Sequence, residues 1–254
     1  MKILVSNDDG IGSVGINILV EELKKVGDVV VIAPATEQSA AGHSITMKNP
    51  LRVKEHFVDN KFFGYAINGT PADCIKIGIK NILEYNPDLV VSGINNGSNA
   101  AINVIYSGTV SAAREAAIMG VPSIAISVDS HTPEHYEYAA KIAGKLAKFV
   151  CEKKLRRGTL LNVNVPDLSE EEIQGLAITK QGESKWDDYY EERIDPYGEK
   201  YYWLTGKMEY QDKEKDRDVI ALKNGYVSIT PVHFDFTDYE MLKTMQSWNL
   251  GLLK

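Results

Sequence analysis

The sequence predicts an α/β protein with a doubly wound, mostly parallel sheet, an extended C-terminal β-hairpin arm and a C-terminal helix. Short apolar runs of strand length alternate along the chain with segments of helical spacing, which is typical of a parallel sheet. Most runs are apolar throughout, as in strands that are buried on both faces. After about Gly182 the residues become aromatic and densely charged, which matches neither a linker nor such a sheet.

The chain opens with a predicted buried strand, Ile3–Val5, that ends in Asn7, Asp8, Asp9 and Gly10. Open α/β sheets bind ligands at the carboxyl ends of their strands. Two carboxylates ~4 Å apart near a surface repel by about 4 kcal/mol at an effective dielectric of 20. A divalent cation offsets this repulsion, because Mg²⁺ and Mn²⁺ bind carboxylate, amide and hydroxyl oxygens. The stretch therefore indicates a metal site, although the same residues also favour a solvated turn.

A second pattern overlaps this stretch, because Gly10, Gly12 and Gly15 match the glycine spacing of a dinucleotide-binding loop. Such a loop offers backbone N–H groups to a pyrophosphate, which the two adjacent aspartates would repel. No acidic residue closes the second predicted strand, Val29–Ile32. Both observations argue against direct binding of NAD.

The remaining elements follow from spacing and from capping residues. Helices are expected at 16–25, 70–83, 110–119, 134–153 and 238–248. The second of these begins at Thr70-Pro71-Ala72-Asp73, which supplies an N-cap, a proline at the first position and an acidic first turn. Strands are expected at 29–32, 89–92, 123–127, 160–165 and 226–230, and a hairpin at 51–57 and 62–67 around Asp59-Asn60.

Two further polar loops reach the edge where the first strand ends. One surrounds Ser39, after the second strand, and the other is a glycine-rich loop around Asn95, after the strand at 89–92. Together Asp8, Asp9, Ser39 and Asn95 would give an all-oxygen shell suited to one Mg²⁺ or Mn²⁺ ion.

An anion site is predicted beside this shell. Ser107-Gly108-Thr109 precedes a helix and offers hydroxyl groups and free backbone N–H groups. The same residues would also make an ordinary helix N-cap. A metal site and an anion site at one edge of a sheet together point to phosphoryl chemistry.

Composition excludes several classes of partner. The chain has 254 residues and a net charge of -7, which argues against a stable nucleic-acid partner. Its two cysteines, Cys74 and Cys151, lack CxxC spacing and are expected to be thiols of a reducing compartment. Neither a signal peptide nor a bilayer-spanning run is evident, so we expect a soluble, cytoplasmic protein without a membrane partner.

Five ordered motifs resemble those of the SurE family, the survival-protein nucleotidases. They are Val-Ser-Asn-Asp-Asp-Gly-Ile at 5–11, Ala-Pro-Ala-Thr-Glu-Gln-Ser-Ala-Ala-Gly-His-Ser-Ile-Thr at 33–46, Gly-Thr-Pro-Ala-Asp-Cys at 69–74, Val-Ser-Gly-Ile-Asn-Asn-Gly-Ser-Asn at 91–99 and Tyr-Ser-Gly-Thr-Val-Ser-Ala-Ala-Arg-Glu at 106–115. The resemblance extends through Gly-Tyr-Val-Ser-Ile-Thr-Pro near the C-terminus and so covers nearly the whole chain.

This resemblance implies a divalent-metal-dependent phosphatase that converts nucleoside monophosphates to nucleoside and phosphate. Activity on 3′-nucleotides and polyphosphate is left open. It also implies a Rossmann-like catalytic domain, placed at 1–182, and a swapped oligomerisation arm with a returning strand and helix, placed at 183–254, that builds homodimers or homotetramers. The family's metal-ligand positions fall on Asp8, Asp9, Ser39 and Asn95, and its phosphate-contacting positions on Asn96, Ser107, Gly108 and Thr109.

The chemistry allows more than one mechanism at these positions. In the favoured one, Asp8 and Asn96 are catalytic, and Asp8 is a candidate to accept a proton from the attacking water. In a rival mechanism, Asp8 is a nucleophile that forms an aspartyl-phosphate, but such enzymes usually separate their two aspartates by one residue. A different class, a nucleotide-binding regulatory module without turnover, is also compatible with the sequence.

The arm is predicted from its aromatic residues. Residues 183–218 hold six of the thirteen tyrosines and two of the three tryptophans among charges of both signs. Large aromatic side chains are enriched at interfaces, and an isolated hairpin is marginally stable in water. We therefore expect the arm to lie on a partner subunit; the alternative is a lid that folds back on its own domain.

A few polar residues have two interpretations of similar weight. His43, in the loop around Ser39, is either a substrate contact or a loop hydrogen bond. Arg114 and Glu115 are either a supporting pair or part of a solvated helix face. His131 and His135 are expected at the surface, because Thr132-Pro133 lies between them.

Overall fold

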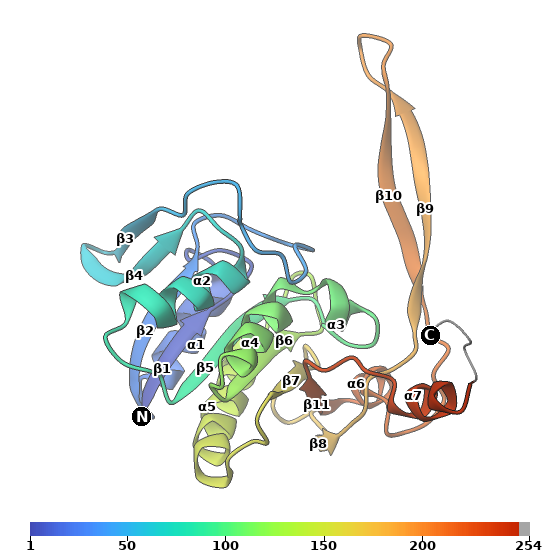
Figure 1. Ribbon diagram of the computed structural model, residues 1–254. Coiled ribbons are helices and arrows are strands. Elements are labelled where there is room, and N and C mark those ends of the chain that lie inside the picture. Colours follow the sequence, from blue (N-terminus) through green and yellow to red (C-terminus); the bar gives the residue numbers. More distant parts are fainter. Residues whose placement is uncertain (249–254) are drawn as a thin grey trace, which may run out of the picture.

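A nine-stranded sheet forms the centre of the molecule within residues 1–248, the part that the computed structural model describes (Figure 1). The strands are β1 Lys2–Ser6, β2 Asp28–Pro34, β3 Val53–Val58, β4 Lys61–Ile67, β5 Leu89–Asn96, β6 Ser123–Val128, β7 Thr159–Val165, β8 Gly175–Ile178 and β11 Tyr226–His233. Their order is β3-β4-β2-β1-β5-β6-β7-β11-β8. From β4 to β7 all pairs are parallel, whereas β3 and β11 pair antiparallel with β4 and β7. The prediction of a mostly parallel α/β sheet is confirmed.

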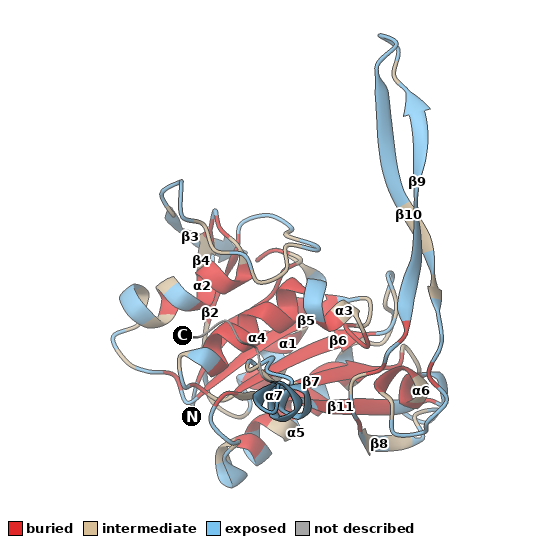
Figure 2. Ribbon diagram, turned by 45° about the vertical axis from the view of Figure 1, so that its right-hand side comes forward, coloured by how far each residue is buried: buried red, intermediate tan, exposed pale blue. Residues whose placement is uncertain are grey.

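Helices cover both faces of this sheet (Figure 1). On one face lie α1 Val14–Leu23 and α5 Tyr136–Lys153, which enclose an apolar layer that includes Leu19 and Ala143. On the other lie α2 Pro71–Ile77 and α4 Gly108–Ile118, around Ile75 and Ala116. The strands between the two layers are buried along most of their length (Figure 2). A doubly wound sheet of this kind presents the carboxyl ends of its strands at one edge, where the polar loops gather.

The capping residues act as the sequence indicates. Thr70 Oγ1 accepts a hydrogen bond from the N–H of Asp73 at 3.1 Å, and Asp73 Oδ2 accepts from the N–H of Thr70 at 2.9 Å. This reciprocal pair starts α2. The helical path then continues as a π-helical turn, η1 Gly78–Ile82, so the predicted helix at 70–83 consists of two geometries.

Three short elements were not predicted: α3 Asn103–Tyr106, β8 and α6 Asp218–Lys223. Each is too short to show a hydrophobic period. The predicted loop beginning at Gly93 is also wrong, because β5 continues to Asn96 after an irregularity in its pairing with β6. At Gly93 φ is +140°, and a Cβ would stand 2.3 Å from the carbonyl oxygen of Ile126. Only glycine permits this close approach, and the bend carries Asn95 and Asn96 to the edge of the sheet.

The predicted arm is a hairpin of β9 Lys185–Ile194 and β10 Lys200–Glu209, which pair in a separate two-stranded sheet. It projects away from the rest of the chain (Figure 1), and its strands are mostly exposed (Figure 2). Every residue of β9 is exposed. The C-terminal helix is present as α7 Tyr239–Gln246, with Asp238 as its N-cap.

Two buried carboxylates fix the root of the arm. Asp218 accepts hydrogen bonds from the N–H groups of Ala101 and Gly182, both at 2.9 Å. Asp212 accepts from the N–H of Ser184 at 2.9 Å and from its hydroxyl at 2.6 Å. The hairpin therefore leaves the sheet in a fixed direction, although its strands have few contacts beyond each other.

Candidate active site at the carboxyl edge of the sheet

A cavity of about 330 Å³ lies at the carboxyl edge of the sheet. Among its lining residues are five of the predicted site residues: Asp8, Ser39, Asn95, Asn96 and Ser107. They come from the ends of β1, β2 and β5 and from the start of α4. The structure therefore brings together residues that lie up to about a hundred positions apart in the sequence.

Asp8 is the most enclosed carboxylate of this cavity, with 4% of its surface exposed. Thr109 Oγ1 donates a hydrogen bond to Asp8 Oδ1. Gly108 permits this contact, since a Cβ there would stand 2.7 Å from Asp8 Cβ and 2.8 Å from its Oδ2. Burial raises the pKa of Asp8, while hydrogen bonds from Thr109 and from the backbone of Gly108 oppose the shift. The start of α4 is therefore built directly against this side chain.

Asp9 lies beside it and has its own connection to β5. The N–H of Asn96 donates to Asp9 Oδ2 at 3.4 Å. Burial, and then the nearby Asp8 carboxylate, raise the pKa of Asp9 to about 7. Two adjacent carboxyl groups that are both hard to ionise are stabilised in their charged forms by a cation. The effect of Asp8 on Asp9 has the direction that the sequence predicts for two adjacent carboxylates.

The neutral side chains present the right atoms for such a cation. Asn95 Nδ2 donates hydrogen bonds to the carbonyl oxygens of Asn96 and Gly97, at 3.2 and 2.7 Å. The amide is therefore oriented with Oδ1 as the atom that remains for a cation. Ser39 Oγ donates to Glu37 Oε1 at 2.6 Å and keeps its lone pairs for a ligand. Within residues 1–248 no group of three or more His, Cys, Asp or Glu side chains is arranged to hold a metal. An ion here would rely on two carboxylates, neutral oxygens and water, a donor set that suits Mg²⁺ or Mn²⁺.

Asn96 faces the same cavity from the end of β5. Its Oδ1 accepts a hydrogen bond from the hydroxyl of Tyr136 at 2.5 Å, which leaves Nδ2 as a donor. Tyr136 belongs to α5 and was not among the predicted site residues. Its place could not be inferred, because it reaches the site only through the packing of α5 beside β5.

Ser107 has both of the roles considered for it. Its Oγ accepts from the N–H of Val110 at 3.0 Å, so it caps α4, and it also lines the cavity. The start of α4 thus lies at the cavity, and its Thr109 hydroxyl donates to Asp8. The N-terminal end of a helix favours anions.

The loop that carries Ser39 is joined to α4 through the buried carboxylate of Glu115. His43 Nε2 lies 2.9 Å from Glu115 Oε2, and Lys76 Nζ contacts the other carboxylate oxygen. Burial acts to raise the pKa of Glu115, but hydrogen bonds from His43 and Lys76 outweigh it, so that pKa lies below its usual value. His43 thus has the loop hydrogen bond that was one of its two interpretations. Glu115 connects it to the helix that also carries Thr109.

The solvated-face interpretation of Arg114 and Glu115 is wrong. They are 4% and 3% exposed, and all residues of α4 from Gly108 to Ala117 are buried. Arg114 Nη2 donates to the carbonyl oxygen of Val104 at 3.2 Å. The run of small residues in this helix is the signal that was available, because it permits close packing on every side.

These features define a doubly wound α/β protein with an acidic, oxygen-lined site at the carboxyl edge of its sheet. The family model described as "Survival protein SurE" matches residues 3–188, and the chain belongs to this family. It is 48% identical, over 98% of its length and 100% of the relative's, to a protein of Syntrophobacter fumaroxidans named 5'-nucleotidase SurE. A relative of the same name from Chlorobaculum tepidum is 45% identical over 98% of this chain and 94% of its own.

A solved structure supports the same assignment. The crystal structure of the SurE protein from Aquifex aeolicus superposes with a TM-score of 0.84 at 42% identity, covering 97% of this chain and 98% of that one. The resemblance found in the sequence motifs is therefore confirmed. Among residues 1–248, no helix is both long enough and apolar enough to cross a membrane.

Proposed function

We propose that this protein is a divalent-metal-dependent 5′-nucleotidase that hydrolyses nucleoside monophosphates to nucleoside and phosphate. One observation carries the proposal: Asp8 lines an oxygen-lined cavity beside the start of a helix, and both Asp8 and the adjacent Asp9 have raised pKa values. The names of the relatives, at 45–48% identity over nearly the whole chain, support the nucleotide as substrate.

In this proposal Asp8, Asp9, Ser39 and Asn95 hold one Mg²⁺ or Mn²⁺ ion per subunit. When bound, the ion supplies positive charge to the phosphoryl oxygens and lowers the pKa of water. The chain's own residues do the rest. Asn96 Nδ2 and the helix start at Ser107, Gly108 and Thr109 bind the non-bridging oxygens of the phosphoryl group.

Asp8 is the proposed acceptor of the proton from the attacking water. Its carboxylate lines the cavity, where it can accept a proton from water. The hydrogen bond from Thr109 holds the carboxylate in one orientation. His43 is proposed to keep the Ser39 loop against α4, in contact with Glu115, and so to support the substrate-binding surface.

The proposed assembly is a homodimer or homotetramer built on the arm, with residues 1–182 as the catalytic unit and 183–254 as the oligomerisation unit. The exposed aromatic side chains along the hairpin, among them Tyr189, Tyr190, Tyr202 and Trp203, support this assembly.

Release of inorganic phosphate from AMP, GMP and 3′-AMP tests the function. We expect release from the 5′-nucleotides that stops in EDTA and returns with Mg²⁺ or Mn²⁺. A regulatory module without turnover would bind these nucleotides and release no phosphate. Release at the same rate in EDTA would contradict the metal dependence.

Acid quenching of a single turnover with AMP that carries ³²P separates the two chemical mechanisms. Direct attack by water on the phosphoryl group transfers ³²P to inorganic phosphate and leaves none bound to the protein. Transient ³²P in a peptide that contains Asp8 would support the aspartyl-phosphate route instead.

A further inference from the structure

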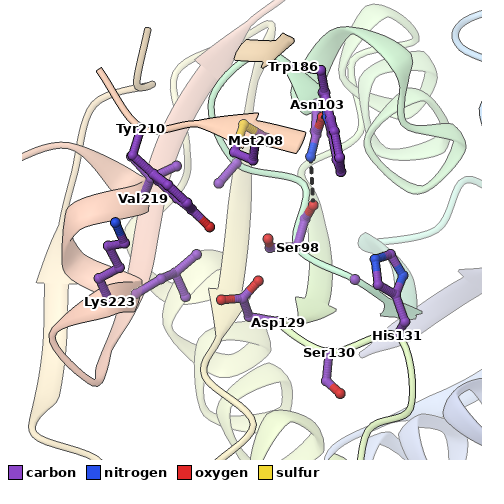
Figure 3. A pocket seen from close by; sticks show the side chains of 13 residues that line it. Ser98, Asn103, Asp129, Ser130, His131, Trp186, Met208, Tyr210, Val219 and Lys223 are labelled. Atoms are coloured by element: carbon purple, nitrogen blue, oxygen red, sulfur yellow. Dashed lines mark hydrogen bonds between the residues drawn. The ribbon is translucent and has the colours of Figure 1, made fainter. Parts of the chain in front are cut away.

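A second cavity, of about 180 Å³, lies directly beside the proposed active site. The two cavities share Gly97, Ser98, Asn103 and His131 as lining residues. The two cavities therefore adjoin at these residues. The first is acidic and oxygen-lined, and the second is walled in part by the root of the arm (Figure 3).

One side of the second cavity, formed by the arm and α6, is largely aromatic and apolar. Trp186 stands at the beginning of β9, and its Nε1–H donates to Asn103 Oδ1 at 2.8 Å, which fixes the plane of the indole. Met208 and Tyr210 come from the returning strand and the residue after it. The buried side chains of Val219 and Leu222, from α6, complete the wall. An aromatic side chain in such a wall offers a stacking surface to a flat ring system.

One acidic side chain enters this apolar space. Asp129 follows β6, and its carboxylate points into the cavity between Tyr210 and Ser98 (Figure 3). The nearest basic side chain of the wall, Lys223, has its Nζ 3.5 Å from the centre of the Tyr210 ring. A carboxylate accepts hydrogen bonds and repels anions. The cavity therefore disfavours a second phosphate group and favours a neutral ring that carries N–H donors.

We propose that this second cavity binds the base of the nucleotide whose phosphate occupies the first, with Trp186 as the stacking surface and Asp129 as the acceptor for an amino group of the base. The inference rests on the proposed function: if the phosphate of a nucleotide binds in the first cavity, its base is the part that reaches the second. Adenine, guanine and cytosine carry the required amino group. Uracil presents an N–H between two carbonyl oxygens, and these oxygens would face the carboxylate.

The location of this subsite has a consequence for the arm. Its root, at Trp186, Met208 and Tyr210, contributes directly to the second cavity, whereas its distal part extends away from it. The arm thus has two separable roles, and the buried contacts of Asp212 and Asp218 fix the part that binds the base.

The test compares AMP with ribose 5-phosphate, which has the same phosphate and sugar without a base. In Trp186→Ala we expect the KM for AMP to rise about tenfold relative to the KM for ribose 5-phosphate, in line with the strength of base stacking on an aromatic ring. Trp186→Phe should recover most of this difference. Phe149→Ala is the matched control, because Phe149 lies on α5 with 57% of its surface exposed and does not line the cavity. Sedimentation of each variant establishes that its assembly is that of the wild type.

A binding measurement gives a readout that does not depend on turnover. In the double variant Trp203→Phe, Trp248→Phe, Trp186 is the remaining tryptophan of the chain. Adenosine, which lacks the phosphate, should quench its fluorescence in a saturable manner, and ribose should not. Asp129→Ala should weaken the binding of adenosine severalfold and leave that of uridine within twofold.

The outcomes separate the two proposals. If the wild type hydrolyses AMP but Trp186→Ala changes both KM values equally, and adenosine leaves Trp186 fluorescence unchanged, the base subsite is wrong and the nucleotidase stands. If the wild type releases no phosphate from AMP but adenosine quenches Trp186, the cavity binds the base and the enzymatic function is wrong.

Discussion

The carboxyl edge of the sheet and the arm are built in opposite ways. At the sheet edge, Asp8 is 4% exposed and is held by Thr109, and its neighbours come from strands locked between two layers of helices. Along the arm, each strand pairs only with the other, and most side chains face solvent. The first region is rigid because the whole core positions it. The arm is held in place only at its root, by the hydrogen bonds of Asp212 and Asp218.

This contrast teaches where each kind of function is located. Catalysis requires groups held close to their productive geometry, which the buried edge provides. The proposed assembly would use the extended, exposed surface of the projecting hairpin. The base subsite lies where the two regions meet, at the part of the arm that the core still fixes.

The largest expected effect concerns Asp8. In Asp8→Asn we expect kcat for AMP to fall by about 10²–10⁴, because the variant loses both a ligand of the ion and the proposed proton acceptor. In EDTA its melting temperature should equal or exceed that of the wild type, since the repulsion with Asp9 is relieved. Turnover equal to that of the wild type at limiting Mg²⁺ would contradict the metal-site assignment.

The next prediction separates the root of the arm from its distal part. Asp188 and Gly206 are register partners, so residues 189–205 can be replaced by a two-residue Asn-Gly turn. This shortened chain keeps Trp186, Met208 and Tyr210. We expect it to sediment as a monomer that retains activity on AMP. A shortened chain that still sediments as a dimer would refute assembly through the distal arm.

A smaller effect is expected at the network behind the Ser39 loop. Glu115→Gln leaves a neutral, buried amide between His43 and Lys76, and the loss of charge-assisted hydrogen bonds should cost about 1–3 kcal/mol of unfolding free energy. Urea unfolding measures it. Glu21→Gln, which breaks an exposed pair with Lys24, is the matched control and should cost less than about 1 kcal/mol. Equal losses in the two variants would contradict a structural role for the network.

The same network predicts a direction with pH. The pKa of Glu115 is lower in the folded protein than its ordinary value of 4.5, so the unfolded state takes up its proton first as pH falls. The stability that Glu115 contributes is therefore full above about pH 4.5 and is lost as pH falls through the lowered pKa. The difference in unfolding free energy between the wild type and Glu115→Gln should shrink in that acid range. If the difference in unfolding free energy grows as pH falls below about 4.5, the predicted direction is wrong.

The regions also differ in how far the sequence predicted them. At the sheet edge, apolar runs and polar strand ends predicted Asp8, Asp9, Ser39 and Asn95 as site residues, because the end of a strand and the chemistry of the loop after it are local signals. Tyr136 and Glu115 were missed as site residues, since each reaches the site through helix packing that no periodicity encodes. For the arm, aromatic composition predicted a hairpin, but the hydrogen bond between Trp186 and Asn103 joins residues 83 positions apart and was not predictable.

The central claim is that the paired carboxylates of Asp8 and Asp9 hold the ion on which hydrolysis depends. Calorimetric titration of Mn²⁺ into metal-free protein, with phosphate release from AMP measured at each point, tests it most directly. We predict that activity rises in proportion to occupancy and saturates at one ion per subunit, and that the double variant Asp8→Asn, Asp9→Asn neither binds Mn²⁺ nor releases phosphate. Full activity in the metal-free protein, or Mn²⁺ binding unchanged in the double variant, would contradict the claim.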